Sequence, residues 1–279
     1  MLILRTRAEL RSYRGGLDPK ARVGLVPTMG ALHEGHLSLV RQALRECDQV
    51  IATIFVNPLQ FGPKEDLARY PRPFDQDVAL LSAAGCSVLF APEVSEVYSP
   101  DASTQVIESR VAKPLCGSFR PGHFDGVTTV VLKLFMMSQP HSAYFGQKDA
   151  QQCAVIERMV RDLDIPIQLT RGDTVREADG LAMSSRNRYL TENERSAAPS
   201  IYAALKKVKE AYQAGEVEAE RLEQIGRAHL QGEPSLQVQY FELRDSITLE
   251  QVNRADPNTT VFVAAILGST RLIDNLRFS

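Results

Sequence analysis

The chain has 279 residues, of which 44% are hydrophobic and 24% charged, and its formal net charge is −2 at pH 7. This length allows one large domain or two smaller ones, each with a buried core, and the composition is that of an ordinary globular protein. The charge excludes a globally basic surface, so we expect no nucleic-acid partner and conclude that any anion site must be local.

The four cysteines are scattered, without a CxxC pair. This spacing argues against a zinc ribbon or a disulfide framework and is typical of the reducing cytoplasm. No apolar run approaches the length of a membrane span. We therefore expect a cytoplasmic protein that has no membrane partner.

The first predicted elements form a strand–helix–strand unit. The apolar run from Val23 to Val26 ends at Pro27 and indicates a buried strand. Apolar residues recur at helical spacing from Leu37 to about Cys47, and the β-branched run Val50 to Val56 predicts the next strand. Such a unit implies parallel strands with a right-handed crossover.

The alternation of strands and helices continues to about residue 170. Helices are predicted over 75–84, 127–137 and 149–162, and strands over 87–90, 143–145 and 165–169. We expect Gly85 to end the first of these helices and Asp149 to cap the third. The pattern predicts an α/β fold with a doubly wound parallel sheet.

The pattern changes after about Arg188. Thr191 and Glu194 form a capping-box signature, and charged helices are predicted over 191–213 and 216–230. Strand-like runs follow at 238–243, 260–266 and 271–273. We interpret this part as a smaller α+β C-terminal domain, with domains over 1–180 and 181–279.

The segment from Val26 to His36 follows the first buried strand and carries His33 and His36 three residues apart. Ligands of an open parallel sheet bind beyond the carboxyl ends of its strands. Gly30 and Gly35 let the backbone approach a ligand, and the N-terminus of the next helix favours phosphate. We interpret the segment as part of a nucleotide site.

Two alternatives remain open for the histidine pair. The rings could be surface or capping groups. Histidines at positions i and i+3 can also ligate zinc, with His123 as the candidate for a third ligand.

Two other polar segments carry groups suited to a nucleotide. Met183-Ser184-Ser185-Arg186-Asn187 supplies hydroxyls and a planar guanidinium, although alone it is typical of a polar loop. Phe145 to Gln152 repeats the pattern of strand end, glycine and helix. There Lys148 can bind a phosphate and Asp149 a ribose, or the two can form a surface ion pair.

Two further segments carry polar side chains that could reach the same site. Asn57 to Phe61 follows the second strand, and its amides can bind a hydroxyl or a carboxylate, or simply form a turn. Arg120 and His123 lie in a predicted turn that enters a helix, where they either approach the site or are structural.

Together these motifs resemble the pantoate–β-alanine ligase (pantothenate synthetase) family of the HxGH nucleotidyltransferase superfamily. Met183 to Asn187 resembles the second superfamily signature, with Arg186 where lysine is common. The resemblance covers nearly the whole chain, in order, through Val26–His36, Ile54–Phe61, Glu65–Arg72, Arg120–Gly126, Phe145–Gln152, Asp179–Leu190 and Arg271–Asn275.

The resemblance implies a Rossmann-like N-terminal domain, a C-terminal lid domain, a homodimer, and ATP, Mg²⁺, (R)-pantoate and β-alanine as ligands. It implies that His36, Lys148 and Arg186 are catalytic, and that Asp77 lies near the magnesium ion. The implied pantoate residues are Pro27, Met29, Asn57, Gln60, Tyr70 and Gln152. The implied ATP residues are Met29, Gly30, His33, His36, Gly146, Lys148, Asp149, Val175, Met183, Ser184, Ser185 and Arg186.

The implied reaction has two steps. The pantoate carboxylate attacks the α-phosphorus of ATP and releases pyrophosphate, and the β-alanine amine then attacks the acyl carbon of pantoyl adenylate and releases AMP. One alternative is a nucleotidyltransferase that leaves the nucleotide on its product, and another is a binding module without catalysis. Gln60 and Gln152 favour the ligase.

Overall fold

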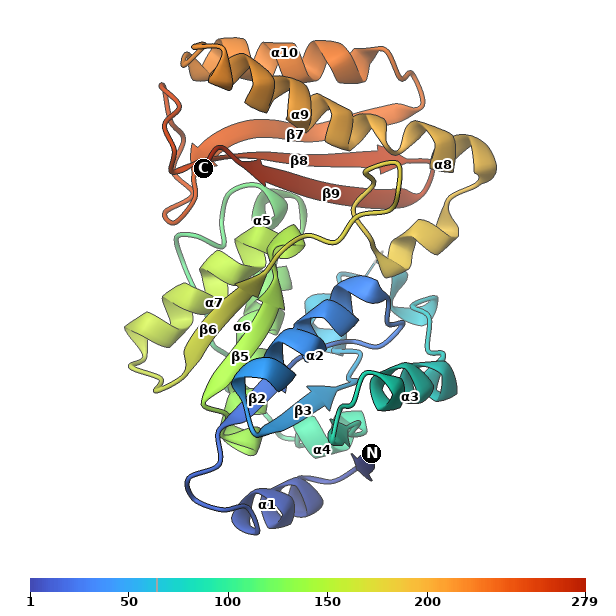
Figure 1. The fold of residues 1–279 in the computed structure, drawn as a ribbon, viewed down its shortest axis with the longest axis vertical. Helices are drawn as coiled ribbons and strands as arrows, with labels where there is room; N and C mark the ends of the chain where they lie inside the picture. Colours follow the sequence, from blue (N-terminus) through green and yellow to red (C-terminus); the bar gives the residue numbers. More distant parts are fainter. Residues whose placement is uncertain (64) are drawn as a thin grey trace.

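The computed structural model describes residues 1–63 and 65–279. Within these residues, six parallel strands form one sheet and three antiparallel strands form a second. In Figure 1 the small sheet lies between the first sheet and the helices α9 and α10. The predicted α/β class and the doubly wound parallel sheet are confirmed.

The strand order of the first sheet creates a crevice. The order is β1-β4-β3-β2-β5-β6, so the chain leaves β2 for β3 on one side and reaches β5 on the other. Ligands bind at such a reversal, beyond the carboxyl ends of the strands. The strands are β1 (Leu2–Leu4), β2 (Val23–Val26), β3 (Gln49–Thr53), β4 (Val88–Phe90), β5 (Ser142–Gly146) and β6 (Gln168–Gly172).

Helices cover both faces of this sheet. Ala143 and Phe145 of β5 pack with α1, α6 and α7, whereas Tyr144 packs on the opposite face with α2 and α3. The helices are α1 (Arg7–Gly15), α2 (Glu34–Glu46), α3 (Phe74–Ala83), α4 (Val94–Val97), α5 (Cys116–Phe119), α6 (His123–Ser138) and α7 (Ala150–Asp162). Short 3₁₀ turns are η1 (Pro58–Gln60), η2 (Asp66–Ala68), η3 (Gln147–Asp149) and η4 (Ser185–Tyr189).

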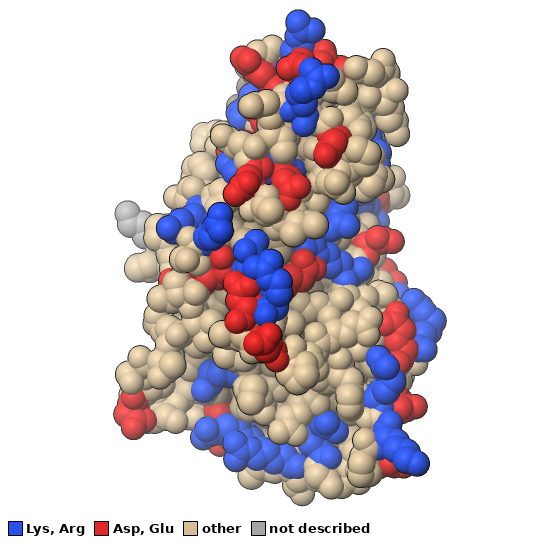
Figure 2. Space-filling view, turned by 90° about the vertical axis from the view of Figure 1, so that its left-hand side faces the viewer, with Lys and Arg blue, Asp and Glu red and all other residues tan. Residues whose placement is uncertain are grey.

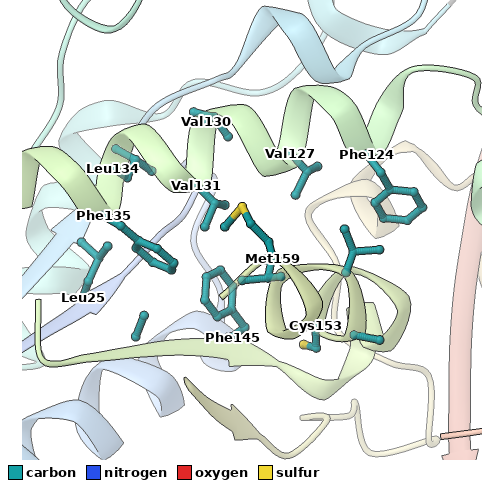
Figure 3. Packing of buried hydrophobic residues seen from close by; sticks show 14 of the residues in the cluster. Leu25, Phe124, Val127, Val130, Val131, Leu134, Phe135, Phe145, Cys153 and Met159 are labelled. Carbon is teal, nitrogen blue, oxygen red and sulfur yellow. The ribbon is translucent and has the colours of Figure 1, made fainter. Parts of the chain in front are cut away.

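Helix α6 is buried along most of its length, as its nearly continuous apolar sequence requires. Figure 3 shows Val131 and Phe135 of α6 pointing toward Phe145 of β5 and Met159 of α7. This packing fixes α6 beside the carboxyl end of β5, where the crevice opens.

The C-terminal part has its own core. Val261 and Val263 of β8 pack with α9 and α10, whereas Phe262 and Ala264 pack with the first domain. The small sheet therefore has one face against its own helices and the other against the large domain. Its elements are α8 (Glu192–Ala197), α9 (Ser200–Gln213), α10 (Ala219–Gln231), β7 (Leu236–Asp245), β8 (Thr259–Leu267) and β9 (Thr270–Arg277).

Several local predictions need correction. The helix expected over 191–213 is divided into α8 and α9 around Pro199, which has no N–H to continue a helix. The strand expected over 165–169 lies at Gln168–Gly172, because Ile167 N donates to Ile165 O in a turn (2.8 Å). Asp149 is the N-cap of α7, but its side chain makes no capping hydrogen bond. The sequence did not reveal β1, α1, α4 or α5.

Other local predictions are confirmed. Gly85 follows α3 with φ of 86°, a left-handed conformation that favours glycine. Thr191 and Glu194 form the predicted capping box.

Both signs of charge are distributed over the surface. Figure 2 shows acidic and basic side chains interspersed on the face that it presents. Within residues 1–63 and 65–279, no helix is long and apolar enough to span a membrane.

Candidate active site

A cavity of about 220 Å³ opens beyond the carboxyl ends of β2 and β5. All the residues predicted for ATP and pantoate line it, except Gly30. They are Pro27, Met29, His33, His36, Asn57, Gln60, Tyr70, Gly146, Lys148, Asp149, Gln152, Val175, Met183, Ser184, Ser185 and Arg186. The fold thus brings together segments that are far apart in the sequence.

The loop after β2 is fixed by buried polar groups. Thr28 Oγ1 donates to Thr53 O (2.5 Å). Asp77, which is 1% exposed, accepts the backbone N–H groups of Ala31 and Leu32 at 2.8 Å each. Gly30 takes a φ of 81° in this loop. Asp77 lies behind the loop and is absent from the cavity lining, so its place near magnesium stays a prediction.

His33 and His36 cap the N-terminus of α2. Gly35 N donates to His33 Nδ1 (3.1 Å), and His33 N donates to His36 Nδ1 (3.3 Å). Burial first, then the Lys148 charge, lowers the pKa of His33 to about 4. Burial first, then His33, lowers the pKa of His36 to about 3. Both rings are therefore neutral at pH 7.

This capping geometry determines which nitrogen can act on a ligand. A neutral ring that accepts a hydrogen bond at Nδ1 carries its proton on Nε2. Each Nε2–H therefore remains free to donate to an anion in the cavity. The capping interpretation of the two histidines is thus correct, and it is compatible with phosphate binding.

The structure does not support a zinc site at His33 and His36, because the described residues supply no third ligand. Among residues 1–63 and 65–279, no group of three His, Cys, Asp or Glu side chains is placed to hold a metal ion. His123 instead contacts Arg120, whose Nη1 lies 3.0 Å from His123 Nε2.

The turn η3 carries a cation into the cavity. Lys148 Nζ lies 3.8 Å from Asp149 Oδ2, so the ion pair expected as the alternative is present. The Lys148 side chain is 19% exposed and lines the cavity together with Asp149. The pairing therefore does not remove Lys148 from the site.

The loop before α8 contacts the first domain through Arg186. The guanidinium binds both carboxylate oxygens of Asp66, with Nε–Oδ2 at 3.0 Å and Nη2–Oδ1 at 2.9 Å. Ser185 Oγ lies 3.3 Å from the hydroxyl of Tyr70. No sequence pattern indicated the Asp66 pairing, because 120 residues separate the partners.

Buried amides form the other end of the cavity. Asn57 is 1% exposed, and its Nδ2 donates to Gln60 Oε1 (3.1 Å) and Gly126 O (3.0 Å). Its Oδ1 accepts from the Tyr98 hydroxyl (2.8 Å). Gln60 Nε2 contacts Met29 Sδ at 3.2 Å. Asn57 thus orients the Gln60 amide.

Arg120 and His123 line the cavity and also have structural partners. Arg120 forms two 2.6 Å hydrogen bonds to the carboxylate of Glu65. His123 Nδ1 donates to Gln60 O (2.8 Å). Burial first, then Arg120, lowers the pKa of His123 to about 4. Arg120 and His123 therefore both approach the site and have a structural role, the two possibilities that the sequence left open.

An apolar wall of the cavity was missed from the sequence. It consists of Phe55, Val127, Val130, Val131, Leu134 and Phe145. The apolar run of α6 predicted a helix, but nothing in its pattern distinguishes side chains that face a ligand from side chains that face a core.

Comparisons with known proteins agree with one another. The family model described as pantoate-beta-alanine ligase matches residues 2–277. The pantothenate synthetase of Thermotoga petrophila is 50% identical over 276 residues, which cover 99% of each chain.

Solved structures give the same result. The pantothenate synthetase of Thermus thermophilus has a TM-score of 0.95 and 44% identity, over 100% of this chain and 99% of that one. The pantoate-beta-alanine ligase of Francisella tularensis, complexed with beta-gamma ATP and beta-alanine, has a TM-score of 0.84 and 33% identity, over 100% and 98% of the two chains.

Proposed function

The chain belongs to the pantoate–β-alanine ligase family, and from this premise we infer that it condenses (R)-pantoate with β-alanine to form pantothenate, AMP and pyrophosphate. The observation that carries this inference is the composition of one cavity. It combines neutral histidine N–H donors, Lys148 and a serine–arginine loop with buried amides and an apolar wall.

The first step activates pantoate. Its carboxylate attacks the α-phosphorus of ATP in line, the bond to the bridging oxygen breaks, and pyrophosphate leaves. Negative charge grows on the phosphate oxygens, where Lys148 and the Nε2–H of His33 and His36 donate. Fixed donors in a site that excludes water need no reorganisation, so they stabilise the transition state strongly.

The pantoate end of the site supplies polar and apolar contacts. Amides of Gln60 and Gln152 can bind the carboxylate and hydroxyl groups of the acid, with Asn57 orienting Gln60. The apolar wall formed by α6, Phe55 and Phe145 suits the two methyl groups of pantoate. The second step then joins the amine of β-alanine to the acyl carbon and releases AMP.

The residues at the nucleotide end of the cavity fit a magnesium ion that has few protein ligands. The oxygen donors of the nucleotide end include the hydroxyls of Ser184 and Ser185, and no cluster of three acidic or imidazole ligands occurs in the described part of the chain. Such a site suits an ion held mainly by phosphate oxygens and water. The ion would neutralise charge on the phosphates.

We also propose a cytoplasmic homodimer in which residues 181–279 act as a lid domain. Family membership supports the dimer, and the scattered cysteines support the compartment. Met183 to Arg186 line the cavity from the segment that leads into the C-terminal domain. A lid is chemically useful because water would hydrolyse an acyl adenylate.

One coupled assay tests the function. The protein is supplied with ATP, Mg²⁺, pantoate and β-alanine, each omitted in turn, and the products are analysed. We expect AMP and pantothenate in equal amounts only when all substrates are present, and exchange of labelled pyrophosphate into ATP with pantoate alone. A product that retains the nucleotide would favour the nucleotidyltransferase alternative, which the comparisons do not favour.

A further inference from the structure

The last strand of the small sheet contacts the turn that carries Lys148. Asn275 of β9 donates through Nδ2 to Gln147 O (2.9 Å) and Lys148 O (3.0 Å). Its Oδ1 accepts from Gln147 Nε2 (3.1 Å). Asn275 is 4% exposed, so these hydrogen bonds are shielded from water.

The turn η3 has no side-chain cap. Gly146 precedes the turn and has no side chain with which to cap it, and the side chain of Asp149 makes no capping bond to α7. Two successive carbonyl groups of the turn, those of Gln147 and Lys148, instead bind the single amide of Asn275. The orientation of these peptide planes therefore depends on a residue of the other domain.

The position of Asn275 is itself fixed by its neighbour Asp274. This carboxylate is 4% exposed and binds Arg176 through two hydrogen bonds of 2.6 and 3.0 Å. The Arg176 guanidinium lies 3.7 Å from the centroid of the Tyr202 ring in α9. Arg176 therefore joins the strand that carries Asn275, through Asp274, to helix α9, through Tyr202.

We propose that Asn275 is a positioning residue for ATP activation. By binding the carbonyls of Gln147 and Lys148, its amide sets the direction in which the Lys148 ammonium enters the cavity. This proposal rests on the proposed function, in which Lys148 binds the phosphates. Asn275 itself touches no reacting atom.

The test uses near-isosteric variants of the full chain. Asn275→Leu removes the donor and the acceptor, whereas Asn275→Asp keeps the acceptor and removes the donor. We expect both to weaken ATP binding, measured by calorimetry without pantoate, by about tenfold. We expect the kcat of pyrophosphate release to fall by at least tenfold, with the KM for pantoate changed by less than threefold.

A double-mutant cycle separates positioning from general stability. If Asn275 acts through Lys148, Asn275→Leu costs less than twofold in ATP affinity when Lys148→Met is already present. The matched control is Lys209→Met, since Lys209 Nζ donates to Arg277 O (2.9 Å), another polar contact of β9 close to Asn275 that does not involve η3. This control is expected to leave ATP affinity unchanged.

Each outcome has a defined meaning. ATP affinity within twofold of the unmodified chain in folded Asn275 variants would overturn the proposal, and so would a loss that persists undiminished beside Lys148→Met. If neither Asn275 variant folds, Asn275→Ser shortens the side chain and withdraws its polar group from the carbonyls of Gln147 and Lys148, and an unchanged ATP affinity there overturns the proposal. If Lys148→Met alone leaves ATP affinity unchanged, the proposed function of Lys148 has failed instead.

Discussion

At the scale of single residues, some side chains of the site use one polar atom to stabilise the fold and leave another polar atom for a ligand. His33 and His36 accept backbone N–H groups at Nδ1, which satisfies the start of α2 and leaves Nε2–H for a ligand. The sequence indicated that the histidines begin a helix after a strand, and this position was the basis for predicting a phosphate site there. It could not reveal the tautomer, because that depends on the bonds of the folded loop.

Removing a phosphate donor should slow the first step. We expect His36→Ala or Lys148→Ala to reduce pyrophosphate release by about a hundredfold or more, the usual effect of losing one preorganised donor. The exposed Lys20→Ala serves as a charge-matched control that keeps full activity. Turnover of either site variant within threefold of the unmodified chain would contradict the assigned roles.

The buried histidines should also make stability depend on pH. The pKa values of His33, His36 and His123 are about 4, 3 and 4 in the folded chain, below the ordinary value of 6.5. Below pH 6.5 the unfolded chain therefore binds more protons, and each histidine removes up to about 1.4 kcal/mol of stability per pH unit. The contribution of the neutral, buried histidines to the free energy of unfolding is therefore complete above pH 6.5 and is lost as the pH falls toward 4.

Urea unfolding at pH 7.5, 6.0 and 5.0 measures this loss. The side chain of the His123→Gln variant cannot titrate. Between pH 6 and 5 the unfolding free energy of this variant should therefore fall less steeply than that of the unmodified chain, and the two slopes should differ by about 1.4 kcal/mol per pH unit, the effect of one proton. Parallel curves for the variant and the unmodified chain would show that His123 is not buried in its neutral form.

At the scale of elements, one close contact joins the apolar and the polar ends of the cavity. Helix α6 approaches η1 at Gly126, whose carbonyl accepts from Asn57 Nδ2. A Cβ atom on Gly126 would lie 2.5 Å from the carbonyl carbon of Leu59 and 2.6 Å from Gln60 N. Only a residue without a side chain allows this approach.

Gly126→Ala should therefore displace α6 from η1. We expect a loss of roughly 1–3 kcal/mol in the free energy of unfolding, as for other overpacked sites. The KM for pantoate should rise about tenfold, and more than the KM for ATP. Gly15→Ala is the control, since its Cβ would meet no atom within 4 Å; equal effects on the two KM values would contradict the prediction.

The sequence predicted elements better than it predicted contacts between them. The β-strands next to the motifs and the helices that follow them are encoded by local apolar patterns, so β2, α2, β5 and α7 were found with small errors at their ends. The Arg186–Asp66 and Asn275–Lys148 contacts join residues that lie far apart in the chain, with separations of 120 and 127 positions, and no local pattern encodes such pairs. The site residues themselves were placed by the family resemblance more than by periodicity.

At the scale of the whole molecule, ion pairs between residues 1–180 and residues 181–279 lie in very different surroundings, and two of them illustrate the contrast. Asp274 is buried and Arg176 is mostly covered, with side chains 3% and 15% exposed. Arg110 and Glu250 lie 3.7 Å apart with side chains 76% and 71% exposed. Solvent screening makes an exposed pair weak, whereas breaking a buried pair leaves an uncompensated charge.

Deleting one partner of each pair tests this contrast. Arg176→Met should cost about 3 kcal/mol in the free energy of unfolding, the lower end of the range for broken buried pairs, because burial already raises the pKa of Asp274 and allows it to become neutral. Arg110→Met should cost less than about 1 kcal/mol. Urea denaturation of both variants measures the difference, and similar costs would contradict the burial argument.

The Asn275 contact also has a consequence for the order of events during protein synthesis. Asn275 follows Lys148 by 127 residues. A ribosome that adds about 5–20 residues per second needs roughly 6–25 s to cover that distance. During this interval a nascent chain already contains both histidines and Lys148 but lacks the amide that orients the turn. With Asn275 as the positioning residue, we expect an unfinished chain to bind ATP about tenfold more weakly, and to form the reactive acyl adenylate at least tenfold more slowly, than a chain in which translation has passed β9.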